Sequence, residues 1–99
     1  MSQNNIISYY TIEKIFFDSL YPSLDGAAKK IITNILNHIS VSPSNLSSRE
    51  KHQLISYLDT FGYFSLRNSV TALYKALEIS RTVVYNYLKT PYYSEVKSV

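Results

Sequence analysis

Residues 73–88 read LYKALEISRTVVYNYL and divide into two short helical segments separated by Glu78, Ile79 and Ser80. The apolar residues on either side recur at helical spacing: Val70, Leu73 and Leu77 before the turn, then Val84, Tyr87 and Leu88 after it. Ile79 lies between the two apolar faces and can join them. Ser80 can cap the second segment, because its hydroxyl can accept a hydrogen bond from an unpaired amide in the first turn. The stretch therefore predicts two helices packed across a tight turn.

The second segment carries its polar side chains on the face that points away from this packing. These residues are Arg81, Thr82, Tyr85, Asn86 and Lys89. A helix with a cationic, hydrogen-bonding outer face fits the major groove of duplex DNA. An ordinary helical hairpin would also have a polar outer face, and apolar spacing alone favours that interpretation. The short turn, the serine cap and the outer-face residues together favour a helix-turn-helix that binds DNA.

The net charge of +3 is distributed unevenly along the chain. Residues 1–61 contain five basic and five acidic side chains, and the tail from Pro91 balances one of each. The surplus falls between residues 62 and 90, and its members are Arg67, Lys75, Arg81 and Lys89 against Glu78. A local positive field attracts a phosphate backbone, so the distribution favours DNA binding, although so few charges could also be placed by chance.

Composition excludes several other classes of protein. At 99 residues and 45% hydrophobic content, the chain has the size of one small globular domain. The absence of cysteine excludes disulfide scaffolds, zinc fingers and thiol catalysis. Two glycines, Gly26 and Gly62, cannot build a glycine-rich phosphate loop, and we expect no cofactor. No apolar run approaches the roughly 20 residues of a membrane span, and no signal peptide is evident, so we expect a cytoplasmic protein with no membrane partner.

Helix signals recur throughout the chain, and no segment alternates as a half-buried strand does. The expected helices span about residues 11–21, 25–40, 47–61, 66–77 and 81–89. Thr11 is a possible cap for the first, and Pro22 stops it. Ser47 and Glu50 fit a capping box for the third, and Gly62 suits its left-handed end. The expected fold is therefore all-α, with about five helices.

The chain divides by these signals into three parts. We expect an N-terminal extension with one helix (1–24), a helical DNA-binding domain (25–90) with its helix-turn-helix over 66–89, and a C-terminal tail (91–99). Residues 1–7 read as polar and frayed, and 92–99 fit a short strand, an added arm or disorder. Tyr92 and Tyr93 could extend the DNA-binding surface, but we favour their covering the end of the core.

Apolar residues of the first two helices predict self-association. They are Ile12, Phe16 and Phe17, with Ile31, Ile32, Ile35, Leu36 and Ile39. If the remaining short helices leave part of this surface uncovered, the patch favours a two-fold homodimer held by residues 10–40. Two recognition helices would then lie about 34 Å apart, one turn of DNA.

From about Asp25 to Lys89 the chain also carries the blocks of a known family. They are LSSREK (46–51), Leu58-Asp59 with Gly62, Phe64, Leu66-Arg67 and Val70, Ala76-Leu77, Ile79-Ser80-Arg81, and VYNYL (84–88). These blocks resemble the C-terminal DNA-binding domain of YheO-type bacterial transcriptional regulators. The resemblance implies a regulator, with a PAS-like sensor domain upstream if this chain is a fragment. Two positions depart from the pattern: Glu78 stands where the turn usually holds glycine, and Tyr74 where alanine is usual.

The candidate DNA-binding residues are Ser80, Arg81, Thr82, Tyr85, Asn86, Lys89, Lys75 and Arg67. Arg81 can reach guanine N7 and O6 or a phosphate, and Asn86 can pair with adenine N6 and N7. Tyr85 can contact a thymine methyl or a phosphate. Lys75 and Lys89 suit the DNA backbone, and Ser80 serves mainly as a cap.

Catalysis is not expected. His38 and His52 have no carboxylate or second histidine at metal-ligand spacing, so surface or helix-end roles are favoured. No serine lies in a nucleophile elbow, and we see no active site. Two alternatives to a regulator remain: a helical protein–protein interaction module or adaptor, and the DNA-binding arm of a recombinase.

Overall fold

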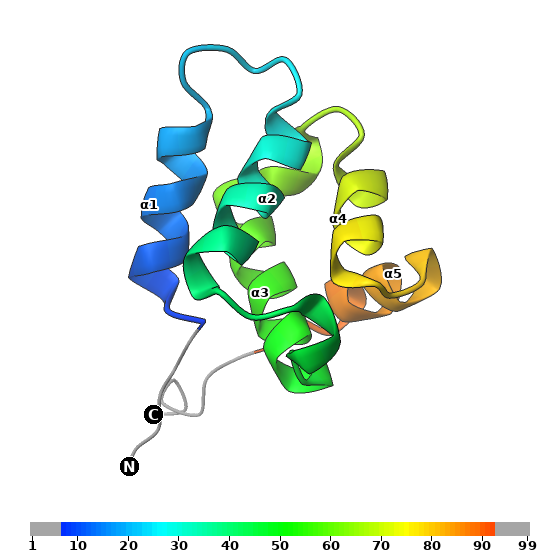
Figure 1. Ribbon diagram of the computed structural model, residues 1–99. Helices are drawn as coiled ribbons and strands as arrows, with labels where there is room; N and C mark the ends of the chain where they lie inside the picture. Colours follow the sequence, from blue (N-terminus) through cyan, green and yellow to red (C-terminus); the bar gives the residue numbers. More distant parts are fainter. Residues whose placement is uncertain (1–6, 93–99) are drawn as a thin grey trace, which may run out of the picture.

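Five α-helices carry the fold over residues 7–92, the part of the chain that the computed structural model describes (Figure 1). They are α1 Tyr9–Ser19, α2 Ala27–Ile39, α3 Ser48–Phe61, α4 Ser69–Leu77 and α5 Arg81–Lys89. Two single-turn 3₁₀ helices, η1 Pro43–Asn45 and η2 Tyr63–Ser65, precede α3 and α4. Residues 7–92 contain no strand, and the expected all-α class with five helices is confirmed.

α2 and α3 lie in the middle of the molecule, with α1 packed on one side and α4 and α5 on the other. α1 packs against α2 and α3 on one side of the molecule (Figure 1). On the other side α4 packs against α2, and α5 packs against α3 and α4. α2 and α3 therefore hold the pair α4–α5 in place. α1 packs against α2 and α3 from the opposite side. Among residues 7–92, no helix is both long and apolar enough to cross a bilayer.

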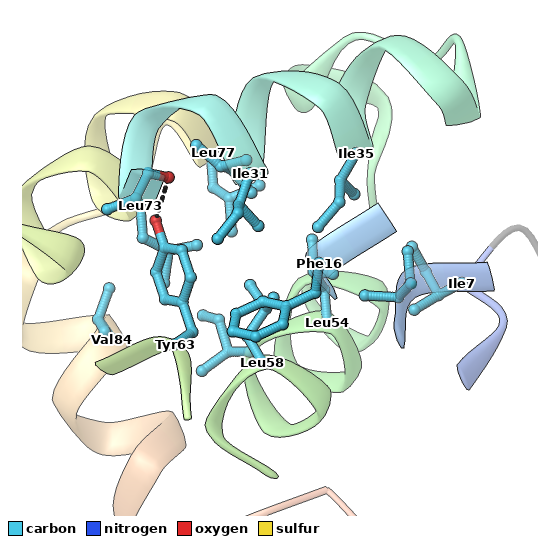
Figure 2. Close-up of a cluster of buried hydrophobic side chains, with 14 of the residues drawn as sticks. Ile7, Phe16, Ile31, Ile35, Leu54, Leu58, Tyr63, Leu73, Leu77 and Val84 are labelled. Carbon is cyan, nitrogen blue, oxygen red and sulfur yellow. Dashed lines mark hydrogen bonds between the residues drawn. The ribbon is translucent and has the colours of Figure 1, made fainter. Parts of the chain in front are cut away.

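One hydrophobic core joins all five helices (Figure 2). Ile12 of α1, Leu58 of α3, Leu73 of α4 and Val84 of α5 are each 0% exposed. The face of α2 that carries Ile31, Ile32 and Ile35 is 0–1% exposed, because neighbouring helices of the same chain cover it. Burial of each such side chain contributes about 1.5–3 kcal/mol. The expectation that this face is left uncovered for self-association is wrong.

α1 begins two residues before the expected start, and the cause lies in Ile7 and Tyr9. Ile7 precedes the N-cap Ser8, and Ile12 is the fourth residue of the helix. Both side chains are fully buried, and apolar residues at these two positions form a hydrophobic staple. Tyr9 packs edge-on against Tyr57 of α3, with ring centroids 5.2 Å apart. The expectation of a polar, frayed start is therefore wrong for Ile7; residues 1–6 lie outside the described part.

The ends of α3 follow the local signals. The Ser47 hydroxyl accepts a hydrogen bond from the Glu50 amide (3.0 Å), and the Glu50 carboxylate accepts one from the Ser47 amide (2.8 Å). This is the expected capping box. Gly62 ends the helix with φ +95°, a conformation that costs glycine little because it has no Cβ.

α2 and α4 begin later than expected, at Ala27 and Ser69. Each follows a residue in the left-handed conformation, Gly26 (φ 68°) and Asn68 (φ 62°), which interrupts a right-handed helix. Asparagine is among the residues that tolerate this conformation best. Between α3 and α4, η2 buries Tyr63, which the sequence did not identify as a core residue.

Candidate nucleic-acid interface

The turn between α4 and α5 is tight and left-handed at its first residue. Glu78 has φ 60° and ψ 44°, the positive φ for which glycine is usual at this position. Its side chain is exposed. The carbonyl oxygen of Tyr74 accepts a hydrogen bond from the Ile79 amide (3.1 Å), which closes the end of α4. Ile79 is half-buried against the core, so it joins the two helices across the turn.

Ser80 starts α5. Its backbone is extended, and its hydroxyl accepts a hydrogen bond from the Val83 amide at 3.1 Å. This contact satisfies one of the amides that a helix leaves unpaired in its first turn, and such a cap contributes about 1 kcal/mol.

α5 has a packed face and an outer face. Val84 is completely buried, and Val83, Tyr87 and Leu88 are half-buried. The residues of the outer face are all exposed: Arg81, Thr82, Tyr85, Asn86 and Lys89. Tyr85 is notable because 47% of a large aromatic side chain lies in solvent. The outer face thus combines two cations, hydrogen-bonding groups and one exposed aromatic ring.

Arg81 lies back over α4. Its guanidinium carbon is 5.4 Å from the centroid of the Tyr74 ring, and Nη2 donates a long hydrogen bond of 3.4 Å to the Thr71 hydroxyl. Tyr74, which stands where alanine is usual, is half-buried against the core and provides the surface on which Arg81 rests. The unusual tyrosine is therefore accommodated beside α5 by a cation–π contact.

The two remaining candidate cations lie apart from the outer face of α5. Arg67 is in the segment between η2 and α4, and Lys75 is on α4. Both line a groove between α2 and α4, together with Lys29 of α2. Lys29 was not expected in this group, because it lies 38 residues before Arg67 and 46 residues before Lys75 in the chain.

His52 of α3 holds the C-terminal end of α5, a helix-end role of the kind expected for it, although the sequence did not identify Tyr87 and Thr90 as its partners. Its ring stacks on Tyr87, with centroids 4.3 Å apart and planes within 13°. Its Nε2 also contacts the Thr90 carbonyl oxygen, and because a carbonyl oxygen only accepts, Nε2 carries the hydrogen. α5 is therefore held at its start by Ser80 and at its end by His52.

Tyr92 extends this contact with α3. Its amide donates a hydrogen bond to the Ser56 hydroxyl (2.8 Å), and its own hydroxyl accepts one from Arg49 Nε (2.9 Å). Tyr92 therefore lies against α3, and its covering of the end of the core stays a prediction. Tyr93 and the rest of the tail lie outside the described residues.

The comparison with known protein families identifies the class of fold. Residues 27–89 match the family described as HTH domain (HTH_22), so the chain belongs to this helix-turn-helix family. No curated protein and no solved structure matches the chain. The matched segment contains α2 to α5, and α1 lies before it. Membership of the family implies DNA as a partner.

Proposed function

We propose that the chain is a non-enzymatic, sequence-specific DNA-binding regulator of transcription that acts in the cytoplasm. The observation that carries this proposal is the outer face of α5, which begins directly after the Ser80 cap and exposes Arg81, Asn86 and Lys89. A helix with this face suits the major groove, whose base edges present hydrogen-bond donors and acceptors. Membership of the helix-turn-helix family supports the same partner.

Asn86 and Thr82 are the proposed base-reading residues at the centre of the face. They lie four residues apart, on the same side of α5. The Asn86 amide can both donate to and accept from adenine, at N7 and N6, whereas Thr82 can serve either kind of partner. Tyr85 would contact a thymine methyl or a phosphate, and Lys89 would contact the backbone.

Arg81 would change its contacts on binding. Its cation–π contact with Tyr74 is at an exposed site and contributes about 0.5–1 kcal/mol, and its hydrogen bond to Thr71 is longer than the optimum. A bidentate contact with guanine discriminates by about 1–3 kcal/mol. The free energy that Arg81 loses on leaving α4 is therefore offset when its guanidinium reaches a guanine or a phosphate. Lys75 and Arg67 are proposed as further phosphate contacts.

Salt-dependent binding of a labelled duplex of random sequence tests this function. With about three to five phosphates contacted per subunit, the logarithm of the affinity should fall with the logarithm of the salt concentration, with a slope of roughly −3 to −5. Lys14→Gln is the matched control, because Lys14 lies on α1 and pairs with Asp18. Its slope should equal that of the native chain. Binding that does not change between low and moderate salt would contradict the proposal and favour an adaptor.

We also propose a two-fold homodimer, now through the outer face of α1. Tyr10 and Phe17 lie seven residues apart on one side of this helix and are 78% and 48% exposed. A symmetric contact here would present two α5 helices to half-sites about 34 Å apart. Light scattering at high micromolar concentration should give twice the chain mass, and Phe17→Ser should halve it. A monomeric native chain would overturn this assembly.

The YheO-type context belongs to the proposal as well. In such a regulator a PAS-like sensor precedes the DNA-binding domain, and the division into residues 1–24, 25–90 and 91–99 would separate an extension, that domain and a tail. A reading frame that continues upstream of the Met1 codon and encodes a sensor would support this context. An upstream region without one would contradict it.

A further inference from the structure

A groove of about 860 Å³ lies between the N-terminal half of α2 and α4. Ala72 and Ala76 of α4 line it and are half-buried, whereas Ala28 and Ile32 of α2 form a floor that is only 4% and 1% exposed. Leu24, which is 64% exposed, stands at one edge. Ligand sites in proteins are typically concave, mainly apolar and about 300–1,000 Å³ in volume. The groove therefore has the size and the lining of a small-molecule site.

The charged residues that line the groove are mainly cationic. Lys29, Arg67 and Lys75 are exposed there, and Asp25 is the acidic side chain among the lining residues. None of the three cations forms a salt bridge within residues 7–92, where the ion pair is Lys14–Asp18 on α1. An anionic group in the groove would thus meet cations that are not already neutralised.

Two helix starts add to the positive potential. α2 begins after Gly26 and α4 after Asn68, both groove-lining residues, and neither helix has a side-chain cap. Amides in a first helical turn carry the positive end of the helix dipole, and each favours a nearby anion by about 0.3–1 kcal/mol. The helix starts and the three cations therefore both favour a negatively charged ligand.

We propose that this groove binds a small organic anion, with an apolar body of one or two rings and one carboxylate or sulfonate group. The apolar body would lie on Leu24, Ala72 and Ala76, which are accessible in the groove, and the acidic group would lie near Arg67 and the two helix starts. A phosphodiester strand could reach Arg67 and Lys75 at the rim, but it would leave the apolar part of the groove uncovered, because it has no apolar body of its own. Thr71 also lines the groove and accepts the hydrogen bond from Arg81, so a bound anion would adjoin the start of α5.

Titration of the full chain with 8-anilinonaphthalene-1-sulfonate, an apolar double-ring anion, tests the inference by fluorescence and calorimetry. We expect one site per chain. The double variant Arg67→Gln/Lys75→Gln should weaken binding by about tenfold, because two favourable charges are lost. Lys51→Gln removes one cation on α3, outside the groove, and should change the affinity by less than about twofold. Thr33→Phe places a ring in the groove from an exposed position and should weaken binding by at least about fivefold.

The uncharged analogue N-phenyl-1-naphthylamine separates charge recognition from a merely apolar patch. We expect it to bind the native chain more weakly than the anion does, and to bind the double variant as it binds the native chain. Equal affinity of both probes, many probe molecules per chain, or equal losses in the double variant and Lys51→Gln would overturn the inference. Circular dichroism should show native helix content in every variant. No DNA is present in these titrations, so their outcome is independent of the salt-dependence experiment.

Discussion

The buried hydroxyl of Tyr63 donates a hydrogen bond of 2.9 Å to the carbonyl oxygen of Ala28 (Figure 2). Tyr63 lies in η2, directly before the segment that leads into α4, and Ala28 lies in the first turn of α2. The bond therefore joins the start of the helix-turn-helix to the helix that supports it. Because the Tyr63 side chain is 0% exposed, no bulk water can replace this partner if it is lost.

Tyr63→Phe should destabilise the protein by about 1 kcal/mol. The ring stays buried, and only the hydroxyl and its hydrogen bond are removed. Urea unfolding at neutral pH measures the difference. Tyr21→Phe is the matched control, because Tyr21 is 79% exposed, and it should lie within about 0.5 kcal/mol of the native chain. Equal stabilities of all three proteins would show that the Tyr63 bond contributes nothing.

The same tyrosine predicts a loss of stability at alkaline pH. Burial raises the pKa of the Tyr63 phenol well above its ordinary value near 10. The folded protein therefore holds this proton more tightly than the unfolded chain does, so the contribution is complete below pH ~10 and is lost as the pH rises further. The free energy of unfolding should fall there by up to about 1.4 kcal/mol per pH unit from this group alone. The free energy of unfolding of Tyr63→Phe should fall less steeply with pH than that of the native chain. Parallel pH profiles of the two proteins would show that Tyr63 is not the group responsible.

Glu78→Gly should stabilise the protein by about 1 kcal/mol. Glu78 holds a positive φ of 60°, which places its Cβ close to the following carbonyl oxygen, and glycine removes that clash. Glu13→Gly makes the same chemical change within α1 and should destabilise by about 1 kcal/mol, because glycine is a poor helix former. Thermal or urea unfolding of the two variants shows directly whether each substitution stabilises or destabilises the protein. A destabilised Glu78→Gly would mean that the glutamate makes compensating contacts.

Asn86→Ala and Lys89→Ala should separate base reading from backbone contact. On a preferred DNA site, Asn86→Ala should cost about 1–3 kcal/mol, with little effect on random duplex. Lys89→Ala should weaken both complexes by a similar factor and make the salt slope less steep by about one unit. Anisotropy titrations against both duplexes provide the four affinities. Equal losses for both variants on both DNAs would show that Asn86 reads no base.

Local signals in the sequence were sufficient for the helix ends that a capping side chain or a left-handed glycine defines. Ser47 with Glu50, Gly62 and Ser80 each act within a few residues, so their neighbours in the chain determine what they do. The outer face of α5 could be predicted in the same way, because helical spacing alone separates the buried Val84 from the exposed residues. DNA contacts at these residues stay predictions.

Contacts between distant segments could not be predicted. Tyr63 and Ala28 are 35 residues apart, and His52 and Thr90 are 38 apart, so no local pattern specifies either pair. The burial of Ile7 and the convergence of Lys29 with Arg67 likewise depend on how the helices pack. The same packing covers the face of α2 that the sequence alone left open to self-association.

The anchoring of α5 at both ends has a consequence for the thermodynamics of DNA association. With Ser80 bonded at its start and His52 stacked on Tyr87 at its end, the helix is ordered before it meets a ligand. Binding then requires little loss of conformational entropy, and its heat-capacity change should reflect only the surfaces brought together. Removal of the histidine ring would let the last turn unfold in the free protein. Calorimetry would then record the refolding of that turn as an additional, more negative heat-capacity change on binding.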